Sequence, residues 1–171
     1  MTRHPLPLHM PGWRLCAHVG QAAPPAHWRE ALAQMLGHRP RRLGEWTELA
    51  LYGALGCLQA AGETQLPPAA RLRLLSRGGP AQAQREALAQ WQEDLPMPFT
   101  FMQSQPAITL AALAQGLGWQ GDAAFLAMRG EGPAALTALG LAGAADAGLL
   151  LGRVEAGPDG LRSEWWRWVR Q

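Results

Sequence analysis

Lysine and asparagine are both absent from this chain of 171 residues, so all fifteen basic residues are arginine. Thirteen acidic residues leave a net charge of only +2, and charged residues make up 16% of the sequence. The arginines are scattered, apart from a short cluster at Arg39, Arg41 and Arg42. Nucleic-acid-binding domains carry a strongly basic stripe or patch, so this balance argues against that class. Apolar residues, at 48%, exclude an intrinsically disordered chain.

Cysteine is scarce and no long apolar run exists. Cys16 and Cys57 lie far apart without a Cys-X-X-Cys or Cys/His spacing, so we expect free thiols and no metal site. All five histidines precede residue 39, share no ligand spacing and have no acidic neighbour in sequence. No stretch approaches the roughly 20 apolar residues of a membrane span, and prolines interrupt the first eleven residues. These absences predict a cytoplasmic protein that contacts neither membrane nor nucleic acid.

Apolar periodicity and glycine or proline punctuation predict alternating helices and strands. Residues 97–103 are apolar but show no period, and we expect an extended, irregular segment there. Interleaved buried strands and helices are typical of a layered α/β fold with a mixed, mainly parallel sheet. We expect a single domain over residues 1–171, with residues 1–11 loosely ordered. The predicted helices span 26–36, 44–61, 81–93, 108–117 and 134–144, and the predicted strands span 13–19, 71–76, 124–128, 147–154 and 161–169.

Two predicted helices have distinctive patterns. The helix over 44–61 is apolar on nearly all sides, which predicts burial on several sides, and its Gly53 and Gly56 predict close packing against another backbone. The helix over 81–93 is amphipathic, with Leu88 and Trp91 in its apolar stripe.

The segment from Phe99 to Arg153 reads as helix, strand, helix, strand, with glycines at the joints. A strand followed by a tight turn and a helix is where many α/β enzymes hold a nucleophile. Here that turn carries Met128 and Arg129, and neither side chain is a nucleophile. No Ser/His/Asp or Cys/His set is visible, so we expect no catalytic residues and no cofactor.

Four stretches together resemble the N-terminal half of a β-ketoacyl synthase, a condensing enzyme of the thiolase-like superfamily. They are EWTELALYGALGCLQAAG (45–62), RLRLLSRGG (71–79), MPFTFMQSQPAITLAALAQGLGWQGD (97–122) and FLAMRGEGPAALTALGLAGAADAGLLLG (125–152). The resemblance rests on small and apolar residues, and Asp122 stands where the family's glycine-rich corner has proline. It places the nucleophilic cysteine of the family on or beside Met128, and the catalytic histidines in a C-terminal half that this chain lacks. Residues around Gln105 and Pro106 replace the family's His-Asn pair.

The resemblance implies a truncated subunit similar to a chain length factor. Such a non-catalytic subunit pairs with a full-length β-ketoacyl synthase as a heterodimer, shapes its acyl tunnel in a polyene, polyketide or fatty-acid-like pathway, and involves acyl carrier protein only indirectly. In this family the strand before the nucleophile pairs across the dimer axis, so the partner interface is expected at Met102, Gln103, Met128 and Arg129, beside an exposed apolar patch over 98–103 and 125–128. Two alternatives remain: a small α/β acyl transferase or hydrolase with an unrecognised site, and a self-associating homodimeric scaffold.

Overall fold

A five-stranded sheet forms the centre of the protein in a computed structural model that describes residues 10–21, 23–95, 97–128, 133–157 and 160–171. The strand order across the sheet is β1-β5-β4-β2-β3. The strands β2, β3 and β4 pair in parallel, whereas β5 runs antiparallel to both β4 and β1. Four strands therefore share one direction and β5 opposes them, which confirms the predicted mixed α/β fold. The strands are β1 (Trp13–Gln21), β2 (Arg71–Ser76), β3 (Ala123–Ala127), β4 (Leu149–Gly157) and β5 (Gly160–Arg170).

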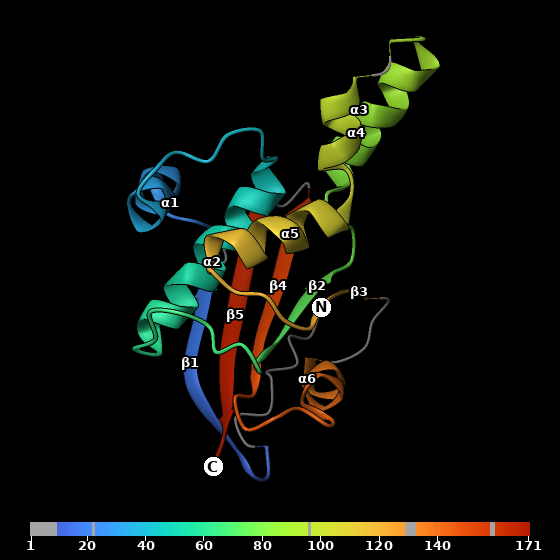
Figure 1. Cartoon of the computed structure of the whole chain (residues 1–171). Coiled ribbons are helices and arrows are strands. Elements are labelled where there is room, and N and C mark those ends of the chain that lie inside the picture. Colours follow the sequence, from blue (N-terminus) through green and yellow to red (C-terminus); the bar gives the residue numbers. More distant parts are fainter. Residues whose placement is uncertain (1–9, 22, 96, 129–132, 158–159) are drawn as a thin grey trace.

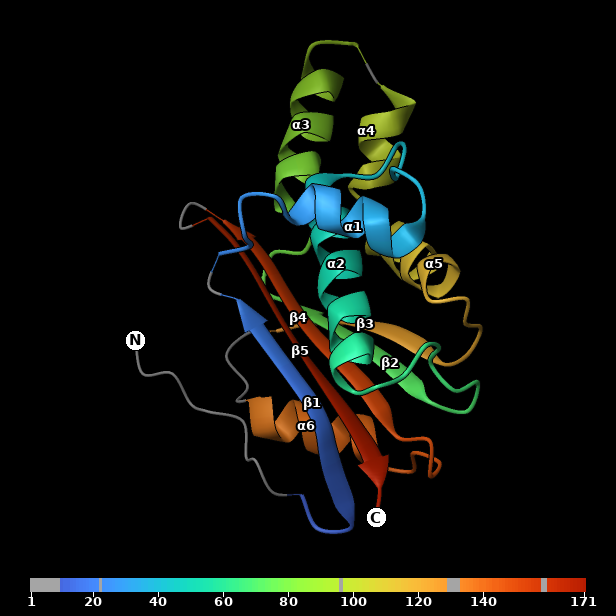
Figure 2. The same ribbon diagram turned by 90° about the vertical axis from the view of Figure 1, so that its left-hand side faces the viewer.

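Helices cover the sheet unequally (Figures 1 and 2). The helices α1, α2 and α5 lie over one face, and α6 lies alone on the other. The remaining pair, α3 and α4, forms a hairpin that projects beyond the end of the sheet. The helices are α1 (Trp28–Leu36), α2 (Glu45–Ala60), α3 (Ala81–Gln92), α4 (Pro98–Gln103), α5 (Pro106–Gly116) and α6 (Pro133–Leu141).

The larger core cluster lies between α2 and the sheet, as the apolar character of α2 predicts. At Gly53 a Cβ atom would lie 2.3 Å from both Ser163 Oγ and Trp165 Nε1, so the helix can approach β5 only with glycine there. Side chains, not another backbone, make this close contact. Close packing was also expected at Gly56, and that expectation is wrong, because a Cβ atom there would meet nothing within 4 Å.

A second core cluster lies on the opposite face of the sheet, under α6.

A buried ion pair fixes β5, the strand that contributes tryptophans to both clusters. Arg167 of β5 is completely buried, and its Nε and Nη2 donate to the Glu63 carboxylate at 2.6 and 2.9 Å. Its Nη1 donates to the carbonyls of Ala147 and Trp168. A buried cation needs such complete pairing, and these bonds tie the turn after α2 to β5.

The expectation of an extended segment over 97–103 is wrong, because residues 98–103 form α4. Pro98 occupies the first turn of this helix, where its missing N–H costs nothing. Ser104 Oγ donates to the Phe101 carbonyl at 2.6 Å, which satisfies one of the last carbonyls of α4. One turn and a half is too short to show a helical period in the sequence. Among the described residues, no helix is long and apolar enough to cross a membrane.

Candidate partner interface

The strand β3 is an edge strand. Over its whole length it pairs with β2, from Leu72 opposite Ala123 to Ser76 opposite Ala127, and within the described residues its other edge has no partner. Its sequence, Ala-Ala-Phe-Leu-Ala, contains no charge and no proline. Edge strands with such residues expose unpaired N–H and C=O groups to another chain, and proteins usually protect them. This edge is therefore suited to pairing with a second protein.

The α3–α4 hairpin, defined here as residues 81–103, exposes an unusual amount of apolar surface. Neither helix contains a buried residue. The other described residues therefore leave the Leu88 and Trp91 side chains of the α3 stripe exposed. Large apolar side chains are rarely left together in this way on a monomer, and such patches mark interaction sites. The exposed side chains are Leu88 (53%), Trp91 (71%), Leu95 (64%), Met97 (56%), Phe99 (43%), Phe101 (62%) and Met102 (47%).

Hydrogen bonds at its base hold the hairpin to the sheet. Glu155, near the end of β4, accepts a hydrogen bond from Ser76 Oγ at 3.0 Å and from the Arg77 backbone N–H at 3.1 Å. Ser76 Oγ in turn accepts from the Gly79 N–H at 2.8 Å, one residue before Pro80, the N-cap of α3. The turn between β2 and α3 is therefore fixed by polar groups of two neighbouring strands, and it aims the hairpin away from the sheet.

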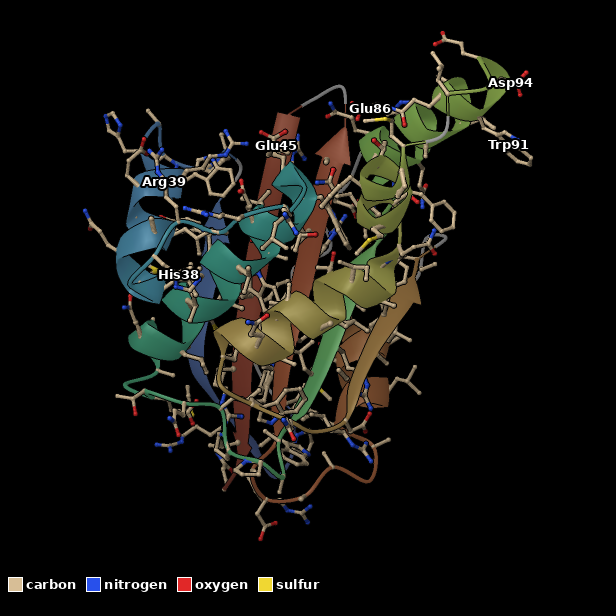
Figure 3. The ribbon with its side chains drawn as sticks, turned by 45° about the horizontal axis from the view of Figure 1, so that its top comes forward. His38, Arg39, Glu45, Glu86, Trp91 and Asp94 are labelled. Carbon is tan, nitrogen blue, oxygen red and sulfur yellow. The ribbon has the colours of Figure 1, made fainter. Side chains whose placement is uncertain are left out.

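The loop before α2 contacts one side of α4. The Arg42 guanidinium lies over the Phe99 ring, 5.2 Å from its centroid, and Gln103 Nε2 donates to the Arg42 carbonyl at 3.4 Å. Arg42 adopts a positive φ of 65°, which is uncommon for a residue with a side chain. Arg39, Arg41 and Arg42 are all exposed, and none forms an ion pair with a described residue. Figure 3 shows that His38 and Arg39, which belong to this loop, lie far from the tip of the hairpin.

The four residues expected at the interface lie in different surroundings. Met102 and Gln103 are neighbours on α4, the first exposed and the second half-buried. Met128 follows β3, donates its backbone N–H to the Ser76 carbonyl, and is buried in the core cluster under α6. Its side chain therefore does not share the exposed surface of Met102. Arg129 lies outside the described residues. Phe125 and Leu126, in the expected apolar patch, are half-buried.

Two cavities can be compared with the needs of an acyl chain. One, of about 40 Å³, lies between α2 and β5 beside Gly53 and is too small for a ligand. The other, of about 360 Å³, lies between the starts of α2 and α3, and Glu45, Glu86 and Gln103 contribute to its lining. Glu45 pairs with Arg29 and Glu86 accepts a hydrogen bond from Gln82, so the wall of the larger cavity is charged and polar, and neither cavity suits an acyl group.

The described residues contain no arrangement typical of nucleophilic or metal catalysis. Burial raises the pKa of the Cys57 thiol to about 12, which keeps it protonated at neutral pH. His18 Nε2 lies 3.1 Å from Glu164 Oε1, and the imidazole stacks on the Trp166 ring. The sequence does not reveal Glu164 as a partner of His18, because the two residues are 146 positions apart. No group of three or more metal-ligating side chains occurs in the described part of the chain.

Neither a protein-family model nor a curated protein sequence matches this chain. A similar solved structure is a chain of the complex between the ketosynthase ApeO and its chain length factor ApeC from Xenorhabdus doucetiae. The TM-score is 0.64 at 14% sequence identity, and the match covers 94% of this chain and 79% of that chain. The fold is therefore thiolase-like, of the kind found in a ketosynthase–chain length factor complex. At this level of identity the likeness establishes the fold and does not transfer an activity.

Proposed function

We propose that this protein is a non-catalytic, ketosynthase-like subunit that pairs with an active β-ketoacyl synthase and shapes its acyl tunnel. The observation that carries this proposal is the fold, which the chain shares with a chain of a ketosynthase–chain length factor complex. Pairing in that complex is a property of ApeO and ApeC, and its transfer to this protein is our inference. The pathway would be one that builds polyene, polyketide or fatty-acid-like chains.

The chemistry of the chain supports a non-catalytic role. A thioether cannot form the thioester through which a condensing enzyme holds its acyl group, and the sequence resemblance puts Met128 at the nucleophile position. The Met128 side chain is also buried among apolar residues. The Cys57 thiol, with its raised pKa, is a poor substitute. Since neither described cavity suits an acyl chain, the tunnel would lie in the partner or at the interface.

The surface of the chain supports a role as a partner. The second edge of β3, which has no partner within the described part of the chain, offers backbone hydrogen bonds to a second sheet, and Met102 with Gln103 presents an adaptable thioether and an amide on α4. We include Arg129 in the proposed interface. We propose that Met128 supports this interface indirectly, because its side chain packs in the core cluster under α6, at the end of β3. The partner would be a ketosynthase, and acyl carrier protein would act on that enzyme.

The test is co-expression of the full chain with each ketosynthase encoded in its source genome, followed by size-exclusion chromatography with light scattering. We expect one ketosynthase to form a stable complex and its product chain length to change when this subunit is present. The isolated chain should show no acyl transfer from an acyl carrier protein. A monomer that binds none of these enzymes, a homodimer that excludes them, or acyl transfer lost on Met128→Ala would contradict the proposal.

A further inference from the structure

The tip of the α3–α4 hairpin carries both apolar and acidic groups. Leu88 and Trp91 lie three residues apart on α3 and so share one face of that helix, and Leu95 follows in the turn. All three side chains are more than half exposed. Glu93 and Asp94, beside them, are exposed and form no ion pair with a described residue. Figure 3 shows Trp91 and Asp94 at the far end of the hairpin, away from the sheet.

The charge of the hairpin differs in sign from that of the whole chain. Residues 81–103 contain one arginine, Arg85, and three acids, Glu86, Glu93 and Asp94, although the chain as a whole has a net charge of +2. Two of the three acids flank the exposed apolar side chains at the tip. A surface complementary to this tip needs an apolar groove with a basic rim. An anionic lipid surface would repel the same acids, which makes it a poor occupant.

The hairpin is also continuous with the proposed interface, because Met102 and Gln103 belong to α4. Two short helices without a buried residue gain little stability from their own packing. An uncovered apolar stripe on them would be stabilised by a partner that removes it from water.

From these observations we infer that the hairpin tip, built from Leu88, Trp91 and Leu95 with Glu93 and Asp94, docks into an apolar groove rimmed by arginine or lysine on the ketosynthase partner. The inference rests on the proposed function and adds to it a second contact, remote from the β3 edge. Trp91 is the anchor of this contact, since buried tryptophans dominate binding energy at interfaces. The acids at the tip set its orientation and its dependence on salt.

The experiment measures the Kd of the full chain for purified ketosynthases of the same genome, at low and high salt. The apolar variant is Trp91→Ala with Leu95→Ala, and its matched control is Leu139→Ala on α6, which has a similar exposure of 61%. The charge variant is Glu93→Gln with Asp94→Asn, and its control is Asp146→Asn, whose side chain is 91% exposed. We expect the apolar variant to weaken binding at least about ten-fold. The charge variant should weaken it roughly two- to five-fold and reduce the salt dependence. Both controls should bind as the unaltered chain does.

Several outcomes would overturn this inference. If a ketosynthase binds all variants equally and only Met102→Asp weakens the complex, the tip is not a contact and the proposed function stands. If no ketosynthase binds even the unaltered chain, the proposed function and this inference both fail. Binding to vesicles of phosphatidylcholine and phosphatidylglycerol, with a blue shift of tryptophan emission that Trp91→Ala abolishes, would assign the tip to a membrane. Self-association abolished by the apolar variant would assign it to a second copy of this chain.

Discussion

Tryptophan occurs in two opposite environments in this protein. Trp165 on β5 is completely buried against α2, and its Nε1 donates to Ser163 Oγ, whereas Trp91 on α3 is 71% exposed. The charges follow the same division: Arg167 in the sheet is fully paired, and Glu93 and Asp94 at the hairpin tip have no ionic partner among the described residues. The sheet packs with α1, α2, α5 and α6 into two buried apolar clusters, whereas α3 and α4 contain no buried residue. The apolar core therefore lies in the first region, and the large exposed apolar side chains gather in the second.

The comparison is tested most strongly by truncating one tryptophan in each region. Trp165→Ala leaves a cavity between α2 and β5 and should lower the free energy of unfolding by about 3–5 kcal/mol. Trp91→Ala removes an exposed side chain and should change it by no more than about 0.5 kcal/mol. Urea titrations followed by far-ultraviolet circular dichroism measure both values. Equal losses at the two positions would mean that the hairpin belongs to the folded core.

Breaking the buried ion pair of the sheet is expected to have the next largest effect. Arg167→Ala leaves the Glu63 carboxylate and two backbone carbonyls without their donor, which should cost about 3 kcal/mol. This value is the lower end of the usual range because the Glu63 side chain is 25% exposed and can recover some solvation. Thermal unfolding of the variant against the unaltered chain gives the difference. A midpoint that stays unchanged would show that the pair does not fix β5.

Alanine substitutions at two glycines of α2 are expected to change the stability of the protein by smaller amounts and in opposite directions. Gly53→Ala forces a Cβ atom against Ser163 and Trp165 and should destabilise the protein by about 1–3 kcal/mol. Gly56→Ala meets open space and should stabilise it by up to about 1 kcal/mol, because alanine is the better helix former. Denaturant midpoints distinguish the two directions, and destabilisation by both substitutions would contradict the described packing of α2.

The smallest effect concerns Asp122, which immediately precedes β3. Arg73 Nη2 donates to Asp122 Oδ2 at 2.6 Å, and this bond lowers the pKa of the carboxyl below its ordinary value of 3.8. A lowered pKa in the folded state contributes stability above pH 3.8, and that stability is lost as the pH falls through the folded value. Because the side chain is 53% exposed, the contribution is under about 1 kcal/mol. In Asp122→Asn this part of the pH dependence below pH 4 should disappear, and an unchanged profile would show that the pair adds nothing.

The fold could be predicted because its strands and most of its helices have local signals. Leucine-rich runs such as Leu149–Leu151, ended by glycine, indicate buried strands, and the stripe of α2 indicates a buried helix. The α4 helix has too few residues to display a period. Long-range pairs, such as Arg167 with Glu63, have no local signal because they depend on how distant segments meet.

The candidate interface was only partly predictable for a related reason. Periodicity identifies the apolar face of α3, around Leu88 and Trp91, but it does not tell whether another element covers that face. The resemblance to a condensing enzyme placed Met102 at the interface, in the segment before the central helix, and the structure exposes its side chain on α4. The same resemblance placed Met128 at the interface, and the structure buries its side chain; apolar character alone does not distinguish a core residue from an interface residue.

Amide hydrogen exchange of this chain, free and in complex with the ketosynthase that we propose as its partner, is the most direct test of the proposed pairing. We expect residues 123–127 of β3 and residues 98–103 of α4 to exchange at least about ten-fold more slowly in the complex. Residues 13–21 of β1, at the opposite edge of the sheet, should exchange at the same rate in both states. Protection confined to β1, or unchanged exchange along β3 and α4 in a stable complex, would contradict an interface on β3 and α4.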